Sequence, residues 1–408
     1  MGGCNSSQAS KLLEKDLMIT IPQIHSKVLL YHKNFTRLNL SNLKLRDDSI
    51  LKLAGILYKN RSIIILDLAN NKLGPKIGKV ISKILNHNNT IKLISLNNNC
   101  LSDIGSSHLF ENLSSNHHII NLQISDNFIS LQGASMISKF LSNNKFIQEI
   151  NISSNRLGSE GNCVVLQGLF LNKSLRRINF SKISFDSVDG IKFAEYMKFN
   201  KKLEKIDLSS NNLSDDAIMA ISESCKILKN LVFLDISKNK IENIGATSLG
   251  HALFKNNSLI ELNLSHNFFG SSALSTFGDA LKVNQKLEKI NFSNNFINDE
   301  GCSSIAYSLF SNKTLKTLIL NCPSVQEEGI SHLGEALKVN TTLTNLDLSE
   351  TFLSVHGSAF LEEGLIENKS IIELKISKSQ LGIVGGVAIG NAIKENYKLK
   401  IIDRKSVV

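Results

Sequence analysis

The sequence predicts an α/β solenoid of about 13 full repeats, each 28 residues long, and three observations predict it. In thirteen consecutive 28-residue segments, the 39 sites at positions 1, 4 and 6 are all apolar. Position 9 is Asn in eight of these segments, and position 15 is Gly in eight. A fixed period of this length indicates small units that bury a common core only by stacking on their neighbours.

Each repeat is expected to open with a short strand. In the segment Leu259–Leu264 the apolar residues at positions 4 and 6 alternate with a polar residue at position 5, which is the period of a half-buried strand. A turn follows, and the Asn at position 9 is expected to satisfy backbone groups that the turn leaves unpaired. The repeats begin at Phe35, Ile63, Ile91, Ile119, Ile147, Leu175, Leu203, Leu231, Leu259, Leu287, Leu315, Leu343 and Ile371, and a partial fourteenth begins at Leu399.

The second half of each repeat predicts a helix. In the tenth repeat, residues 299–301 (Asp-Glu-Gly) open the helix, and Ile305 and Leu309 form an i, i+4 apolar stripe. The Gly at position 15 leaves room where the turn enters the helix. Helices are wider than strands, so the stack is predicted to be a curved horseshoe with parallel strands on its concave side and helices on its convex side.

Five repeats depart from Asn at position 9. The departures are Leu43, Ile183, Pro323, Thr351 and Ser379. The first and last are expected, because terminal repeats cap a solenoid. Ile183 and Pro323 are internal, and they indicate either local drift of the turn or a kink or partner contact.

The pattern LxxLxLxxNxL, seen in the segments 231–241, 259–269 and 287–297, resembles the leucine-rich repeat. A 28-residue unit with a true helix is similar to the ribonuclease-inhibitor-like class, which includes ribonuclease inhibitor, the ligand-sensing arms of NOD-like receptors and the Ran GTPase-activating protein. The resemblance covers residues 35–408. It implies a non-catalytic scaffold that binds other macromolecules, and it specifies the fold far more strongly than the function.

Four segments are expected. These are a flexible lipidated tether (1–10), an N-terminal cap (11–34), thirteen repeats (35–398), and a partial repeat with a tail (399–408). The cap segment has apolar residues at helical spacing, and a helix lying on the membrane is the alternative.

The N-terminus Met1-Gly2-Gly3-Cys4-Asn5-Ser6 fits the motif for N-myristoylation of Gly2. One myristoyl chain binds a bilayer only marginally, so S-palmitoylation of Cys4 is the expected second signal. The predicted location is cytoplasmic and peripheral on a membrane. The sequence shows neither the pattern of a secretory signal nor an apolar run of membrane-spanning length.

The charge favours anionic partners, with 46 Lys and Arg against 36 Asp and Glu. The lysines are spread along the chain, so a solvated surface is favoured over a nucleic-acid site, and no nucleic-acid partner is expected. The six cysteines are widely spaced without a CxxC pair, which indicates neither a zinc site nor a disulfide framework.

No catalytic signature appears, and the chain is expected to be neither an enzyme nor a metal or cofactor protein. The segment 74–80 resembles a phosphate-binding loop, but one residue is missing between its glycines and no Ser or Thr follows Lys79. His117 and His118 are interpreted as a solvated loop.

The candidate partner surface consists of strand positions that folding does not require to be apolar. Two apolar patches are predicted on the concave face, with basic residues between them that could engage an acidic partner. The patch residues are Ile64, Ile65, Leu93 and Ile120, then Val232, Phe233 and Ile260; the basic residues are Arg176, Arg177 and Lys205. The C-terminal residues 406–408 (Ser-Val-Val) also resemble, weakly, a tail captured by PDZ domains.

The predicted function is therefore a membrane-tethered scaffold or adaptor for protein partners. One alternative is a regulator of a small GTPase, by resemblance to the Ran GTPase-activating protein, although the acidic C-terminal tail of that family is lacking. Another is an inhibitor that wraps its target, as the cysteine-rich ribonuclease inhibitor does.

Overall fold

The computed structural model describes residues 36–403, which form two compact units divided between Ile183 and Ser184. The first unit holds β1 (Arg37–Asn39), α3 (Asp47–Lys59), β2 (Ile65–Asp67), α4 (Lys76–His87), β3 (Leu93–Ser95), α5 (Ser102–Leu113), β4 (Asn121–Gln123), α6 (Leu131–Asn143), β5 (Glu149–Asn151), α7 (Gly158–Phe170) and β6 (Arg177–Asn179). The predicted cap at 11–34 and tether at 1–10 lie outside the described residues.

The second unit continues the alternation of helix and strand. It holds α8 (Ser187–Phe199), β7 (Lys205–Asp207), α9 (Asp215–Cys225), β8 (Phe233–Asp235), α10 (Asn243–Leu253), β9 (Glu261–Asn263), α11 (Ser271–Val283), β10 (Lys289–Asn291), α12 (Asp299–Leu309), β11 (Thr317–Ile319), α13 (Glu327–Val339), β12 (Asn345–Asp347), α14 (Val355–Glu367), β13 (Glu373–Lys375), α15 (Gly382–Glu395) and β14 (Ile401–Asp403).

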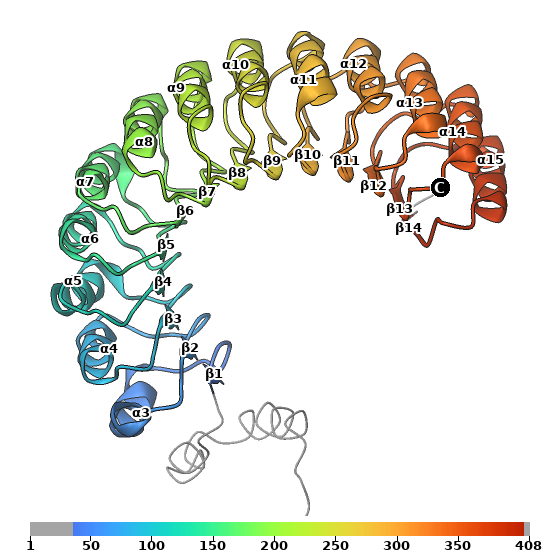
Figure 1. The fold of residues 1–408 in the computed structure, drawn as a ribbon. Coiled ribbons are helices and arrows are strands. Elements are labelled where there is room, and N and C mark those ends of the chain that lie inside the picture. Colours follow the sequence, from blue (N-terminus) through green and yellow to red (C-terminus); the bar gives the residue numbers. More distant parts are fainter. Residues whose placement is uncertain (1–35, 404–408) are drawn as a thin grey trace, which may run out of the picture. The chain divides into compact units, whose positions relative to one another are not determined.

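The strands of each unit pair in sequence order, in parallel, with a constant offset of 28 residues. Leu38 pairs with Leu66 in the first unit, and Leu234 pairs with Leu262 in the second. Within each unit the strands lie on one side and the helices on the other (Figure 1). The α/β solenoid that the sequence predicts is confirmed.

The core is built by the periodic positions that the sequence identifies. Every described residue at positions 1, 4 and 6 of the thirteen repeats is buried. The helices add their own apolar stripe, as Ile305 and Leu309 of α12 show. Because these side chains complete the core, the remaining strand positions are free to face outward.

The Asn at position 9 does what the sequence predicts. The side-chain amide of Asn267 donates to the backbone carbonyls of Leu264 and, one repeat earlier, Ile236, while its Oδ1 accepts from the backbone N–H of Ile241. The bond to the preceding repeat recurs at Asn71, Asn99, Asn127, Asn155, Asn239 and Asn295.

The departures from Asn keep part of this bonding. The hydroxyls of Thr351 and Ser379 donate to the same carbonyl of the preceding repeat, at 3.2 and 2.9 Å. In the eleventh repeat the buried thiol of Cys322 lies 3.7 Å from the Phe292 carbonyl, while Pro323 is exposed. Ile183 is buried, and its carbonyl accepts from Asn162. These replacement contacts favour local drift of the turn as the explanation for the departures from Asn.

The structure reveals a second Asn ladder, which the sequence analysis does not predict although its period is visible. Position 26 is Asn in twelve repeats, and all twelve side chains are buried. The amide of Asn340 donates to the Leu309 carbonyl, and its Oδ1 accepts from the backbone N–H groups of Thr342 and Leu343. In these twelve repeats the residue therefore fixes the turn that leads from the helix into the next strand, while Leu228 takes its place in the seventh repeat.

Candidate functional site

The outward face of each strand presents positions 3 and 5, which flank the buried residue at position 4. In β8, Phe233 and Asp235 are half-buried around the buried Leu234. Position 2 precedes the strand and also points away from the core, as the exposed side chains of Ile64 and Ile260 show. Positions 2 and 3 therefore present side chains to the surface, whereas position 5 also bonds to the turn, as Asp235 Oδ1 does in accepting from the backbone N–H of Ser237.

The first predicted patch lies within the first unit. Ile65 and Leu93 are register partners on neighbouring strands and are both half-buried. Lys92 stands between Ile64 and Ile120, because its backbone bonds to both of them. The structure therefore brings Ile65 and Leu93 together, and it separates Ile64 from Ile120 by a lysine.

The second predicted patch lies within the second unit. The backbone N–H of Ile260 donates to the Val232 carbonyl, so these side chains lie at the same position just before two adjacent strands. The ammonium group of Lys205 lies 5.9 Å from the centre of the Phe233 ring, on its face. A cation over an aromatic face is an attractive arrangement. Val232, Phe233, Ile260 and Lys205 thus form one mixed apolar and basic surface.

The predicted basic residues of the first unit are exposed. Arg177 forms an ion pair of 3.3 Å with Glu149 on the neighbouring strand, and both side chains are partly solvated. Solvated pairs contribute less than about 1 kcal/mol, so an acidic partner can compete for this arginine. Arg176 is also exposed.

A polar hollow on the strand face was not found by sequence reasoning. It has a volume of about 250 Å³, and its lining includes Lys289, Thr317, Asn345, Asp347 and Lys375. Lys289 pairs with Glu261 at 2.5 Å, and Lys375 pairs with Glu373 at 3.2 Å. The signal in the sequence was a set of charged and polar residues at positions 3 and 5 of the tenth to thirteenth repeats.

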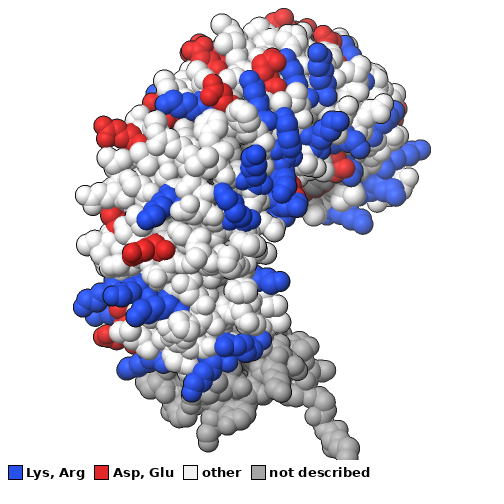
Figure 2. All heavy atoms as spheres, turned by 60° about the vertical axis from the view of Figure 1, so that its left-hand side comes forward, with Lys and Arg blue, Asp and Glu red and all other residues white. Residues whose placement is uncertain are grey.

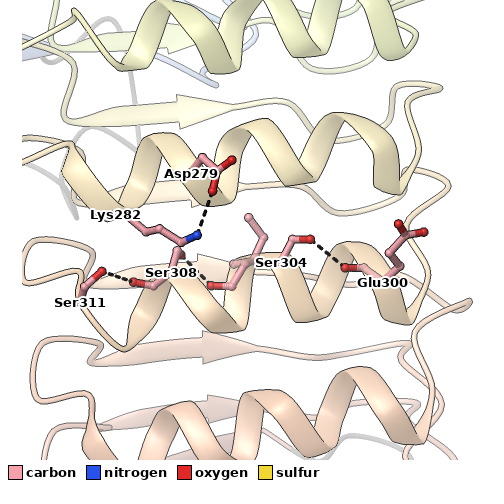
Figure 3. Close-up of polar contacts among 7 residues, drawn as sticks. Asp279, Lys282, Glu300, Ser304, Ser308 and Ser311 are labelled. Atoms are coloured by element: carbon pink, nitrogen blue, oxygen red, sulfur yellow. Dashed lines mark hydrogen bonds and ion pairs between the residues drawn. The ribbon is translucent and has the colours of Figure 1, made fainter.

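Three serines in and just after α12 bond to backbone carbonyls of the same segment. In α12 the hydroxyls of Ser304 and Ser308 donate to the carbonyls of Glu300 and Ile305, and just beyond the helix the Ser311 hydroxyl donates to the Ser308 carbonyl (Figure 3). A neighbouring pair comes closer to a catalytic arrangement, since Ser303 Oγ lies 2.7 Å from His332 Nδ1. The other ring nitrogen, however, contacts the Tyr307 hydroxyl at 3.1 Å. Both of these His332 contacts are therefore to hydroxyl groups, and neither is to a carboxylate that would orient the ring for catalysis.

The glycine-rich segment at 74–80 has a structural role. The backbone N–H of Gly74 donates to Asp47 Oδ1 at 2.6 Å, so a carboxylate occupies the place that a phosphate would need. A Cβ built on Gly78 would lie 1.9 Å from the Gly105 carbonyl oxygen, which shows how closely α4 packs on α5. His117 packs edge-on against the Phe146 ring at 4.6 Å.

The buried thiols are held in the protonated form. Burial raises the pKa of Cys225 to about 12 and that of Cys322 to about 11, and it also raises the pKa of Cys302. Cys100 is exposed. Within residues 36–403, no cluster of three or more His, Cys, Asp or Glu side chains could hold a metal ion.

The predicted lipidation sites Gly2 and Cys4 lie outside the described residues, as do the C-terminal residues 406–408. None of the described helices is both long enough and apolar enough to cross a membrane.

Comparisons with known proteins agree with the repeat. The leucine-rich-repeat profile matches residues 59–82, 143–161, 199–222, 228–250, 255–278 and 283–306. No curated protein sequence matches the chain.

Solved structures show similar folds. A chain from the yeast Rad7 and Elc1 complex has a TM-score of 0.56 at 14% identity, covering 98% of this chain and 94% of its own. An internalin (inlF) from Listeria monocytogenes has a TM-score of 0.52 at 16% identity, covering 86% of this chain and 89% of its own. At such identities the likeness concerns the fold alone. The constant register, the Asn ladders and the repeat profile together show that this chain is a leucine-rich-repeat protein.

Proposed function

We propose that the protein is a non-catalytic interaction scaffold, held on a cytoplasmic membrane face, that binds a protein partner through its strand surface. The observation that carries the proposal is the patch of Val232, Phe233 and Ile260 beside Lys205. Aromatic and aliphatic side chains that the core does not need, next to a cation, are typical of binding hot spots.

The leucine-rich-repeat fold supports this proposal, because stacked repeats present an extended surface for contact. One structural neighbour comes from a complex of two proteins, Rad7 and Elc1. Membership of the ribonuclease-inhibitor-like class remains a prediction from the repeat length.

The proposed membrane attachment rests on the N-terminal motif. Myristoylation of Gly2 needs a second signal for stable attachment, and we propose palmitoylation of Cys4 for that role. In cell fractionation, Gly2→Ala should move the protein from membranes to the soluble fraction. Unchanged partitioning of this variant would remove the lipid anchor from the proposal.

Affinity capture from cell extract tests the strand surface. Phe233→Asp and, separately, Ile260→Asp should each abolish capture of the partner, because a carboxylate desolvated in an apolar contact is costly. Phe352→Asp is the matched control, since Phe352 is an exposed aromatic residue of the same unit outside the strands. Thermal unfolding confirms that each variant is folded. Full capture by both folded patch variants would rule out this surface.

Regulation of a small GTPase is the rival activity. It predicts that purified protein accelerates GTP hydrolysis by a partner GTPase, whereas the scaffold proposal predicts an unchanged rate.

A further inference from the structure

The segments where each helix ends and turns toward the next strand, called turns below, form a continuous edge of the second unit. They are residues 198–202, 226–230, 254–258, 282–286, 310–314, 338–342, 366–370 and 394–398. Neighbouring turns are bonded directly: the Asn284 amide donates to the Asn256 carbonyl at 2.9 Å, and the Asn340 amide donates to the Asn312 carbonyl at 3.2 Å. The buried Asn ladder therefore places these turns side by side, and at 226–230, where Leu228 replaces the Asn, the Asn230 amide donates to the Lys201 carbonyl and the Ser258 hydroxyl donates to the Leu228 carbonyl.

This edge is strongly basic, and we call it the lysine edge. Its eight turns contain two glutamates, no arginine and thirteen lysines, namely Lys198, Lys201, Lys202, Lys226, Lys229, Lys255, Lys282, Lys286, Lys313, Lys338, Lys369, Lys394 and Lys398. Lys and Arg side chains crowd together on part of the surface seen in Figure 2.

The opposite edge, where the helices begin, carries the opposite charge. Residues 186–189, 214–217, 242–245, 270–273, 298–301, 326–329, 354–357 and 382–385 contain nine acidic residues and neither Lys nor Arg. Figure 3 shows this polarity locally, with Glu300 toward one end of the helices and Lys282 toward the other. The acids have structural partners, as where Asp299 Oδ1 accepts from the backbone N–H of Gln326.

The lysines, by contrast, exceed what the fold requires. A cation in the last turn of a helix complements the helix dipole, but this effect falls off beyond that turn. Four of the lysines pair with nearby carboxylates: Lys226, Lys282, Lys338 and Lys394. Within residues 36–403, the other nine have no acidic side chain at ion-pair distance: Lys198, Lys201, Lys202, Lys229, Lys255, Lys286, Lys313, Lys369 and Lys398.

Each turn of the lysine edge also exposes one large apolar residue. These residues are Phe199, Ile227, Phe254, Val283, Phe310, Val339, Ile366 and Tyr397, and their exposed fractions range from 40 to 74%. A single exposed apolar residue needs no explanation, but one in every turn of the same edge is a pattern. Basic and apolar side chains therefore alternate along its whole length.

A hollow opens on this edge beside two of the turns. Its volume is about 450 Å³, and Lys286, Lys313, Lys316 and Glu288 line it together with Ile260 of the strand patch. Lys316 pairs with Glu288 at 2.9 Å, which leaves Lys286 and Lys313 as the unpaired cations of the lining. The volume lies within the usual range of small-molecule sites. The hollow is therefore large enough for a phosphate-bearing headgroup.

We propose that the lysine edge binds the surface of a bilayer that contains anionic phospholipids, with a headgroup in the hollow between Lys286 and Lys313. Lysines attract anionic headgroups without requiring a fixed geometry, and adjacent apolar side chains can enter the interfacial region. Nucleic acid would make no use of Val283, Val339 and Ile366, and the paired recognition of phosphate for which proteins prefer arginine is missing from these turns. The inference rests on the proposed membrane location and supplies a contact independent of acylation.

Vesicle co-sedimentation tests the inference with the full-length chain. Gly2→Ala protein, which cannot be myristoylated, is mixed with phosphatidylcholine vesicles with or without phosphatidylserine. We expect binding that depends on phosphatidylserine and weakens as salt is raised. In this background, Lys286→Gln with Lys313→Gln should bind roughly ten- to thirty-fold more weakly, since each lysine near an anionic surface contributes about 1 kcal/mol. The control is Lys238→Gln with Lys240→Gln, which removes the same charge elsewhere in the unit and should retain binding.

The apolar half of the edge has its own test. Val283→Ser with Phe310→Ser should weaken binding without changing its salt dependence, because the lysines remain. Phe268→Ser with Phe296→Ser removes two exposed aromatic rings from the turns that follow the strands and should bind as before.

Equal loss in the two lysine pairs would show that net charge alone acts, and it would overturn the proposal. So would equal binding to neutral and anionic vesicles, or binding to acidic protein or nucleic acid in preference to vesicles. A failure here leaves the acyl anchor and the strand patch untouched, because fractionation tests the anchor and partner capture with Phe233→Asp, a residue outside the hollow, tests the patch.

Discussion

The side-chain amide of Asn239 donates a 3.0 Å hydrogen bond to the backbone carbonyl of Leu208, which belongs to the preceding repeat. The same amide bonds to the Ile236 carbonyl within its own repeat, and its Oδ1 accepts from the backbone N–H of Leu213. Asn239 is buried, so these backbone groups have no access to water as a substitute. One side chain thus couples two repeats.

Replacement of Asn239 by Ala should lower the free energy of unfolding by about 3 kcal/mol. The change leaves buried backbone carbonyl and N–H groups without a hydrogen-bond partner, and each such group costs roughly 1–3 kcal/mol when unpaired. Urea unfolding followed by circular dichroism measures the loss. Asn212→Ala, at an exposed position of the neighbouring repeat, should change stability by less than about 0.5 kcal/mol. Equal urea-unfolding midpoints for the Asn239 and Asn212 variants would contradict this account of the Asn ladder.

Gly334 and Gly390 offer a test of helix packing at one repeat position. A Cβ on Gly334 would lie 2.5 Å from the Phe360 carbonyl oxygen, whereas a Cβ on Gly390 would meet nothing within 4 Å. Gly334→Ala should therefore destabilise the protein by about 1–3 kcal/mol through overpacking. Gly390→Ala should stabilise it by up to about 1 kcal/mol, because Ala favours the helix. If thermal unfolding shifts both variants in the same direction, the close approach of α13 and α14 is not as described.

Asp299 should matter more than its neighbour Glu300, although both lie in the first turn of α12. Asp299 Oδ1 accepts from the backbone N–H groups of Gln326 and Gly329 in the next repeat, at 2.6 and 3.0 Å. Asp299→Ala removes an inter-repeat helix cap and should cost about 1–2 kcal/mol. Glu300→Ala removes the same charge from the same helix end, so it controls for the loss of a favourable interaction between an acidic side chain and the helix dipole. Calorimetry should show a lower Tm for the Asp299 variant alone.

Thiol alkylation should separate the described cysteines by burial and pH. The pKa values of Cys225 and Cys322, about 12 and about 11, leave thiolate fractions at pH 8 of about one in ten thousand and one in a thousand. The exposed Cys100 should be alkylated by iodoacetamide at pH 8, while Cys225, Cys302 and Cys322 react only after unfolding. Peptide mass spectrometry reads each site. Rapid labelling of Cys225 in the folded protein would show that the α9 region opens readily.

The direction in which folding stability changes with pH follows from the same pKa values. A raised thiol pKa means that the folded state holds the proton more tightly than the unfolded state does. These thiols therefore contribute no pH dependence at neutral pH, and stability falls as pH rises through the unfolded thiol pKa toward the folded values. Stability measured between pH 6 and pH 10 with Cys225→Ala as reference should show the fall only near the alkaline end.

The sequence alone predicted the repeat, its 28-residue register, the apolar core positions and the role of Asn at position 9. These follow from local chemistry repeated thirteen times, because a side chain that recurs at one position must meet the same environment in each copy. The sequence also placed Phe233, Val232 and Ile260 on the outward face, since their positions alternate with buried ones.

Only the tertiary structure decided which of those surface residues meet. Lys92 separates Ile64 from Ile120, Lys205 covers the Phe233 ring, and Glu149 engages Arg177. The lysine edge was equally hidden, because its residues are spread along two hundred positions and become neighbours only when the helix-to-strand turns stack. Stacking converts a period along the chain into proximity in space, and proximity sets the charge and apolar character that a partner encounters.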